Sequence, residues 1–196
     1  ERSKYELLWW DKEKFNKTNV EGTKNIIEFC TKNNIKLAHI STLSVGGFSN
    51  INDNKILTEN TININQDFKK HIYMITKYQA ECEVLKAINN GLEAKIFRLG
   101  NIMPRMEDGL FQTNKMDNGF LCRMKTILDT KTITKDYKNI EIDISPVDLC
   151  SIAIITLLNN ENNQTIYHIN NNNLITVAEI IKDLDIKEVT SNEQIE

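Results

Sequence analysis

The pattern of apolar and polar residues predicts a helix followed by a strand near the start of the chain. Val20, Ile26 and Cys30 recur at helical spacing within residues 19–32, and the asparagines that follow at 33 and 34 tolerate a left-handed stop. Residues 35–42 (IKLAHIST) then form a short, mostly apolar run. Such a run is typical of a strand that is buried on both faces of a parallel sheet.

The same alternation repeats further along the chain. A second helix is predicted from Ile72 to Asn90, with Gly91 as its stop. Its apolar face is formed by Ile75, Tyr78, Cys82, Leu85 and Ile88. Residues 93–101 (EAKIFRLGN) predict a second buried strand. Helix, strand, helix and strand in this order predict a doubly wound parallel α/β sheet with right-handed crossovers.

The pattern changes after Pro104. The further predicted elements are a helix over 114–133, a half-exposed strand over 140–145, a helix capped by Ser145 with Pro146 in its first position, a strand over 165–170, and a helix over 176–184 capped by Thr176. We therefore interpret residues 1–104 as a partial Rossmann-like catalytic domain. Residues 105–196 are interpreted as a smaller substrate-binding subdomain.

Composition and charge exclude several classes of protein. The 196 residues suit one domain or one and a half, and the formal net charge of -3 lacks the basic footprint of a nucleic-acid-binding protein. The longest apolar run, at 151–158, is too short to span a bilayer. The four cysteines are far apart and without nearby histidine pairs, which predicts reduced core residues and no metal site. Without a signal peptide, the cytoplasm is the expected location.

Candidate chemistry lies at the carboxyl ends of the two predicted strands, where open α/β sheets bind ligands. Tyr73 and Lys77 are four residues apart, so they share a helix face, and an ammonium beside a phenol lowers the pKa of the phenol. Thr42, at the end of the preceding strand, offers a hydroxyl to the same substrate oxygen. Threonine would polarise a carbonyl, tyrosine would donate a proton, and lysine would tune tyrosine and hold a ribose. Each residue alone is more typical of an ordinary structural role, and only the combination favours a catalytic one.

The polar, asparagine-rich segment between these residues, 43–70, is long for a loop in a compact domain. Long ordered loops are usually functional, so we expect this one to border a site.

Four segments together resemble the extended short-chain dehydrogenase/reductases: NVEGT at 19–23, ISTLSVGG at 40–47, YMITKYQAE at 73–81 and FRLGNIMP at 97–104. The resemblance implies a catalytic set of Asn19, Thr42, Tyr73 and Lys77. It also implies a nicotinamide-binding set of Tyr73, Lys77, Gly100, Asn101 and Ile102.

The second half is similar to the thioester reductase domains that end nonribosomal peptide synthetases, and to aminoadipate and carboxylic acid reductases. This resemblance implies hydride delivery from NADPH, with NADH still open, to an acyl or peptidyl thioester on the phosphopantetheine arm of a carrier protein. The product would be an aldehyde or an alcohol, and the protein a monomeric part of a multidomain synthetase. The implied substrate residues are Val45, Gly46, Arg105, Gln112 and Asn114.

The chain departs from the family pattern in one large respect. The glycine-rich pyrophosphate loop is expected before Asn19 and is missing, and Gly46 and Gly47 cannot replace it because they open no helix with the required spacing. Thr76 also stands where the family usually has serine. We therefore expect the chain to be a piece of a longer polypeptide. This piece lacks the half that binds the cofactor, and we expect it to be inactive alone.

Two alternatives stay open. One is another extended reductase, either a fatty acyl-CoA reductase or a nucleotide-sugar epimerase or dehydratase, although SVGG at 44–47 lacks the second tyrosine of the nucleotide-sugar enzymes. The other is a truncated, non-catalytic docking module.

Overall fold

The computed structural model describes residues 12–48, 56–114, 118–162 and 164–190. The chain forms two compact units, one of residues 1–100 and 153–169 and the other of residues 101–152 and 170–196. This division differs from the sequence division at 104 and 105, because residues 153–169 return to the first unit.

The first unit is built on a three-stranded parallel sheet in the order β1-β2-β7. Strand β1 (Leu37–Thr42) pairs along its whole length with β2 (Ala94–Leu99), which in turn pairs with β7 (Ile166–Ile169). The predicted parallel sheet is thus confirmed. Ile40 in β1 is 42% exposed, however, so this strand is buried on one face rather than on both as predicted.

The first predicted helix is a continuous helical segment with three parts. A short α2 (Lys12–Phe15) leads through a π-helical turn, η1 (Asn16–Glu21), into α3 (Gly22–Asn33). Asn34 then adopts a left-handed conformation with φ 53°, and its amide closes the last turn of the helix. The asparagine stop predicted from the sequence is therefore confirmed.

Helix α4 (Ile72–Asn89) lies between β1 and β2 in the chain and ends just before Gly91, whose φ is +99°. Its extent agrees with the prediction, and Leu85 and Ile88 of its predicted apolar face pack against the core, but the most buried face of the helix is a neighbouring one. The fully buried residues are Thr76, Ala80, Glu81 and Val84, whereas the residues of the predicted face are only half-buried. Polar partners make this possible, because Asn19 in η1 donates to the Thr76 hydroxyl, and Ser41 and Arg98 on the sheet bind the Glu81 carboxylate.

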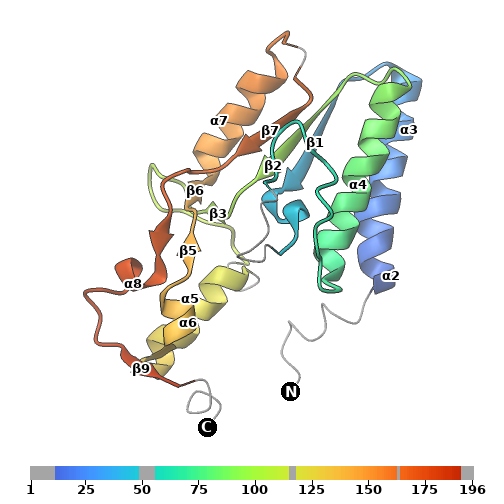
Figure 1. Ribbon diagram of the computed structural model, residues 1–196. Coiled ribbons are helices and arrows are strands. Elements are labelled where there is room, and N and C mark those ends of the chain that lie inside the picture. The colour runs from blue at the N-terminus through green and yellow to red at the C-terminus, as the bar shows by residue number, and fades with distance from the viewer. Residues whose placement is uncertain (1–11, 49–55, 115–117, 163, 191–196) are drawn as a thin grey trace. The chain divides into compact units, whose positions relative to one another are not determined.

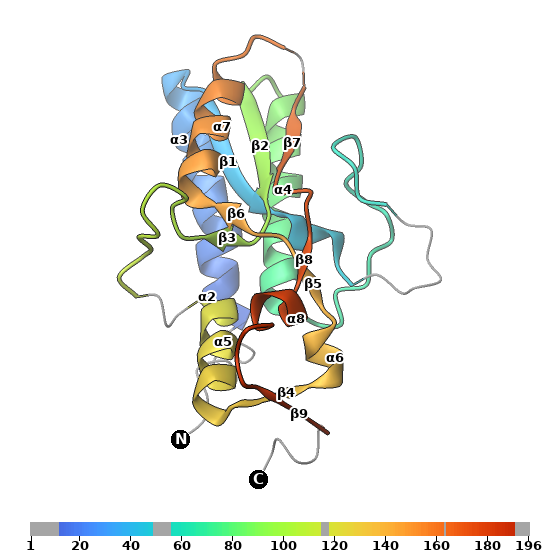
Figure 2. The ribbon, with the colours of Figure 1, turned by 90° about the vertical axis from the view of Figure 1, so that its left-hand side faces the viewer.

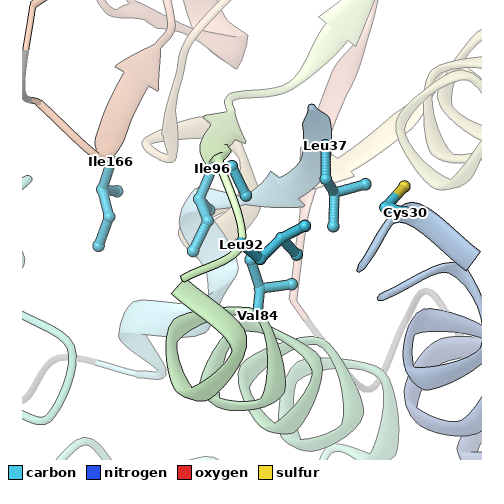
Figure 3. Packing of buried hydrophobic residues seen from close by; sticks show 7 residues of the cluster. Cys30, Leu37, Val84, Leu92, Ile96 and Ile166 are labelled. Carbon is cyan, nitrogen blue, oxygen red and sulfur yellow. The ribbon is translucent and has the colours of Figure 1, made fainter. Parts of the chain in front are cut away.

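The hydrophobic core of the first unit lies between this sheet and the helices α3 and α4. Figures 1 and 2 show these two helices on one face of the sheet and residues 153–158 of α7 (Val147–Leu158) on the other. Figure 3 shows the cluster of buried side chains, which comprises Cys30, Leu37, Val84, Leu92, Ala94, Ile96 and Ile166. Burying one aliphatic side chain of this size contributes about 1.5–3 kcal/mol, so this cluster fixes α4 against β1 and β2.

The segment after β1 begins with a short 3-10 helix, η2 (Leu43–Gly46). Gly47 follows with φ +70°, and an added Cβ there would lie 2.7 Å from the Asp67 carbonyl oxygen. Phe48 pairs with Asp67 as an isolated bridge, and its amide donates to the same carbonyl at 2.9 Å. The two ends of the long loop are thereby joined through a position that only glycine fills without strain.

The loop is also attached to the edge of the sheet. The Glu59 carboxylate accepts the backbone N–H of His168 in β7 at 2.6 Å and the side-chain amide of Gln164 at 2.7 Å. In addition, the Gln66 side chain donates to the carbonyls of Val45 and Ile62. Residues 56–66 are therefore held to both η2 and β7, while residues 49–55 lie outside the described residues.

The second unit contains short elements around a small core of its own. Its helices are α5 (Gly119–Thr130), α6 (Lys135–Lys138), the first half of α7, and α8 (Val177–Ile180). Its strands form three two-stranded sheets: β3 (Ile102–Met103) with β6 (Ser145–Pro146), β4 (Thr132–Thr134) with β9 (Lys187–Val189), and β5 (Glu141–Ile142) with β8 (Ile175–Thr176). The core residues are Ile127, Ile133, Val177 and Ile181.

Two capping predictions in this unit have opposite outcomes. Thr176 caps α8 in a complete capping box with Glu179, as predicted, although the helix ends earlier than residue 184. Ser145 caps no helix: Ser145 and Pro146 form strand β6, and α7 begins only at Val147. The Ser145 hydroxyl instead donates to the Asp143 carboxylate at 2.8 Å, since that acceptor is two residues away.

Candidate active site

Thr42 and Tyr73 meet at the carboxyl end of β1. Thr42 is the last residue of the strand, and its Oγ1 accepts the backbone N–H of Ser44 at 3.2 Å, which starts η2. Tyr73 lies in the first turn of α4, is 38% exposed, and shares a hydrogen bond with the Thr42 hydroxyl. The two hydroxyl groups are therefore together and reachable from solvent.

The pKa of Tyr73 differs from the sequence prediction. Burial raises the pKa of the phenol above its usual value of 10.0, and the hydrogen bond with Thr42 lowers it by less. Lys77 was expected to lower the pKa, but its Nζ donates to the backbone carbonyl of Ile40 at 2.6 Å and so is directed at the strand. Tyr73 consequently holds its proton at neutral pH, as a proton donor must.

Lys77 lies one helical turn from Tyr73 and is half-buried. Burial lowers the pKa of its ammonium, and the nearby Glu81 carboxylate raises it. The bond to Ile40 uses one of the three N–H groups of the ammonium. Lys77 is thus held in place by the strand while donors remain for a ligand.

Asn19 fixes the first turn of the helix that carries Tyr73. Its side-chain amide donates to Thr76 Oγ1 at 2.9 Å, and the Thr76 hydroxyl donates to the carbonyl of Ile72 at 2.9 Å. Asn19 lies in the π-helical turn η1, and its carbonyl accepts the Thr23 hydroxyl at 2.6 Å. Threonine at position 76 makes these contacts through its hydroxyl, which a serine in its place would also offer.

Aromatic rings surround Tyr73, and the sequence did not single them out. Phe15 and His71 both meet the Tyr73 ring edge-on with centroids 6.4 Å apart, and Phe48 lies 6.3 Å from His71. The Lys69 ammonium lies over the Phe48 ring. A sequence signal existed for Phe15 alone, because it precedes Asn19 by four residues on one helical face.

His39 is a second residue that the sequence did not identify. It lies in β1, and its Nε2 is buried without a hydrogen-bond partner among the described residues. Burial, with a smaller contribution from the neighbouring Lys77 ammonium, lowers the pKa of His39 to about 4. His39 is therefore neutral over the whole physiological range.

The predicted nicotinamide-pocket residues follow β2. Gly100 donates its N–H to the carbonyl of Ile169 at 3.0 Å and is the last residue of the first unit in this part of the chain. Asn101 donates its N–H to the Asp143 carboxylate at 2.8 Å, and Ile102 forms strand β3. These residues connect the two units.

The predicted substrate residues are divided between the two units. Val45 is fully buried, and a Cβ added at Gly46 would lie 3.2 Å from the Leu57 side chain. Both residues therefore shape the loop and offer no side chain to a substrate. In the second unit, Arg105 binds Glu107 and Asp108, and the Gln112 side chain donates to the carbonyl of Asn114 at 3.4 Å. The four predicted catalytic residues, by contrast, are brought together in the first unit: Asn19, Thr42, Tyr73 and Lys77.

Within the part of the chain that the structure describes, three or more histidine, cysteine or acidic side chains nowhere gather as a metal site would require. None of the helices described there has the length and apolar character that a membrane crossing demands.

A parallel sheet with helices on both faces, and with this hydroxyl, phenol and ammonium group at the carboxyl end of a strand, makes the first unit a Rossmann-like α/β fold. The family model described as "Male sterility protein" matches residues 11–154. The chain therefore belongs to this family. No curated protein matches the sequence at a significant level.

Solved structures agree with this assignment. A thiolation-reductase di-domain from an archaeal nonribosomal peptide synthetase is 33% identical, with a TM-score of 0.79 over 90% of this chain and 50% of that one. The reductase domain of the aureusimine biosynthetic cluster is 28% identical, with a TM-score of 0.82 over 91% and 49%. The dTDP-glucose 4,6-dehydratase of Bacillus anthracis, in complex with NAD, shares the fold at 23% identity and a TM-score of 0.67 over 90% and 56%.

These matches confirm the resemblance predicted from the sequence. The chain spans about half the length of each of these structures.

Proposed function

We propose that the chain is the catalytic and substrate-side part of an NADPH-dependent reductase that releases an acyl or peptidyl thioester from a carrier protein. The observation that carries this proposal is the hydrogen-bonded pair of Thr42 and Tyr73, with the Lys77 ammonium one helical turn away, at the carboxyl end of a parallel strand. The likeness to a thiolation-reductase di-domain and to a biosynthetic reductase domain supports the choice of substrate.

In the proposed reaction, the hydroxyl groups of Thr42 and Tyr73 both donate to the thioester carbonyl oxygen. When bound, the reduced nicotinamide supplies the hydride that the carbonyl carbon accepts. Tyr73 transfers its proton to the oxygen as negative charge develops there, and burial keeps that proton on the phenol until then. Loss of the thiol from the resulting hemithioacetal leaves an aldehyde, and a second round would give an alcohol.

The residues present fit the nicotinamide riboside end of the cofactor. Lys77 retains N–H groups suited to ribose hydroxyls, and Tyr73 lies one turn away on the same helix. The pyrophosphate end has no matching cradle among the described residues, since η2 is four residues long and is not followed by a longer helix. We expect the 196-residue chain alone to bind NADPH weakly or not at all, which calorimetric titration would measure; micromolar affinity would contradict this expectation.

The proposal includes the partner and the setting. The partner is a carrier protein with a phosphopantetheine arm, and the whole protein is a multidomain synthetase of the cytoplasm. We assign the second unit, with Arg105, Gln112 and Asn114, to the substrate side, and Gly100, Asn101 and Ile102 to the nicotinamide side.

The test uses the complete natural polypeptide with reduced cofactor and a carrier-bound acyl thioester. Replacing Tyr73→Phe removes the proton donor, so turnover falls by about 10²–10⁴-fold while NADPH affinity stays within twofold. The control is Tyr78→Phe, on the same helix, where the ring packs against Phe68 at 5.4 Å and turnover stays at the parental rate. Parental turnover in Tyr73→Phe would refute the assignment of the donor.

Substrate and cofactor choice are tested in the same assay. Comparison of the turnover with NADPH and with NADH decides which of the two is the hydride donor. If none of the thioesters causes oxidation of the cofactor but a nucleotide sugar is turned over, the protein belongs to the alternative class of extended reductases.

A further inference from the structure

A fully buried ion pair lies beside the candidate site. Glu81 of α4 and Arg98 of β2 both have 0% of their side chains exposed. Arg98 Nη2 donates to Glu81 Oε2 at 2.8 Å, and Arg98 Nε donates to both carboxylate oxygens at 3.1 Å. Glu81 follows Lys77 by four residues and Tyr73 by eight, so all three lie on one side of the helix.

The carboxylate end of this pair reaches the strand that ends in Thr42. The hydroxyl of Ser41, the residue before Thr42, donates to Glu81 Oε1. The ion pair thus links three elements that meet at the site: β1, the helix with Tyr73, and β2.

The guanidinium end reaches the ordered loop. Arg98 Nη1 donates to the carbonyls of Thr58 and Thr61, both at 3.1 Å, and lies 3.3 Å from His168 Nε2. Burial and the neighbouring Arg98 lower the pKa of His168, so its neutral ring accepts this contact. The same loop continues through Gln66 to the carbonyl of Val45 in η2, three residues after Thr42.

Stability alone does not account for such a pair. Removing two charges from water costs several kcal/mol per ion, and a buried ion pair is often replaced by apolar residues of similar volume without loss of stability. A registry role is the best-attested use of buried charges. Apart from the contact with His168 in β7, the hydrogen bonds of the pair join β2 to β1, to α4 and to the loop that leads from Thr42 to Tyr73.

We propose that Glu81 and Arg98 are positioning residues, which hold Thr42, Tyr73 and Lys77 in register and dock residues 58–61 beside them. The inference rests on the proposed function only in that Tyr73 and Lys77 act in the reduction. It concerns the geometry of the site and not the identity of the substrate.

The charges of the pair also act on Lys77. The groups near its ammonium are Glu81 on its own helix, His39 on β1, which is neutral, and Arg98 behind Glu81. Burial lowers the pKa of Lys77 and Glu81 raises it. Removing the carboxylate therefore lowers this pKa further.

The test compares Glu81→Gln, Arg98→Met and the double variant Glu81→Met with Arg98→Met in the complete polypeptide. In the pH profile of kcat/KM, we expect the alkaline limb to move to lower pH in Glu81→Gln, because the carboxylate that raises the pKa of Lys77 is lost, and to stay in place in Arg98→Met. The double variant removes both charges, so its thermal midpoint returns toward the parental value. Its kcat nevertheless stays at least about tenfold below the parent, because the links to Ser41 and Thr58 are lost.

Lys95→Met is the matched control. Lys95 is a second buried cation on the same strand, but it donates to the carbonyls of Leu157 and Asn160. Its replacement lowers the thermal midpoint and leaves both kcat and the alkaline limb unchanged. A general effect of losing a buried charge would move all four variants alike.

Hydrogen exchange gives a reading that needs no substrate. In the double variant, the amides of residues 56–66 and of the first turn of α4 exchange faster, while those of α3 do not change. A double variant with parental kcat and parental exchange would overturn the proposal, as would identical pH profiles in the two single variants. If the parent reduces no thioester, the proposed function fails, and exchange together with NMR titration of Lys77 still decides this inference.

Discussion

Gly47→Ala should destabilise the protein through the joint that closes the long loop. Gly47 has φ +70° and ψ -160°, a region of backbone space that is essentially restricted to glycine. An added Cβ would lie 2.7 Å from the Asp67 carbonyl oxygen, which is backbone and cannot rotate away. The bridge between Phe48 and Asp67 must therefore open or shift.

Two contributions give the expected size of the effect. The backbone strain costs about 1–3 kcal/mol. Loss of the hydrogen bond from the Phe48 amide to the Asp67 carbonyl costs about 1 kcal/mol more. The sum of about 2–4 kcal/mol corresponds to a drop of roughly 1–2 M in the urea midpoint, given a slope of about 2 kcal/mol per molar.

Two other glycines separate these contributions. Gly91 has φ +99° but nothing within 4 Å of an added Cβ, so Gly91→Ala reports strain alone, at about 1–2 kcal/mol. Gly22 lies in α3 with its nearest neighbour at 3.7 Å, so Gly22→Ala should stabilise by about 1 kcal/mol. Urea unfolding followed by circular dichroism measures all three. The reasoning is refuted if Gly47→Ala is no more destabilising than Gly91→Ala.

Two further predictions concern pH and capping. The pKa of His39 in the folded protein, about 4, lies below its ordinary value of 6.5, so the unfolded chain binds more protons between these pH values and stability falls as pH falls through this window. The loss approaches about 3 kcal/mol, and His39→Leu should flatten the profile of unfolding free energy between pH 6.5 and 4; an unchanged slope would contradict this. Thr176→Ala removes the capping box with Glu179 and should cost about 1 kcal/mol, seen as faster amide exchange in α8 and not in α5.

Local chemistry made the C-terminal ends of α3 and α4 predictable, whereas the helical segment before α3 begins at Lys12, earlier than the predicted residue 19. Asn34 stops α3 because asparagine tolerates the left-handed conformation, and Gly91 marks the end of α4 for the same reason. The two strands followed from short apolar runs between these stops. None of these inferences needed information from distant parts of the chain.

The buried face of α4 depended on partners that the sequence does not place. Apolar periodicity favoured the face of Ile75 and Tyr78, whereas the interior receives Thr76 and Glu81. Thr76 is satisfied by Asn19, 57 residues away, and Glu81 by Arg98 on the next strand. A charged residue such as Glu81 is expected on the surface of a protein unless a buried partner for its charge is known.

The active-site pair shows the same limit. Spacing on a helix placed Tyr73 and Lys77 on one face, but it could not say where the ammonium points. The Lys77 ammonium donates to the carbonyl of Ile40, so burial rather than the lysine has the largest effect on the pKa of Tyr73. The rings of Phe48 and His71 reach the site through the loop closure, which no local pattern encodes.

The attachment of Glu59 to β7 has a consequence for how the sheet can grow. A strand at the edge of a sheet has unpaired N–H groups that can pair with a strand of another chain, which promotes aggregation. The His168 amide on that side is already occupied by the Glu59 carboxylate, which carries no N–H with which to continue a ladder. The loop thereby protects this N–H of the sheet edge from pairing with another chain.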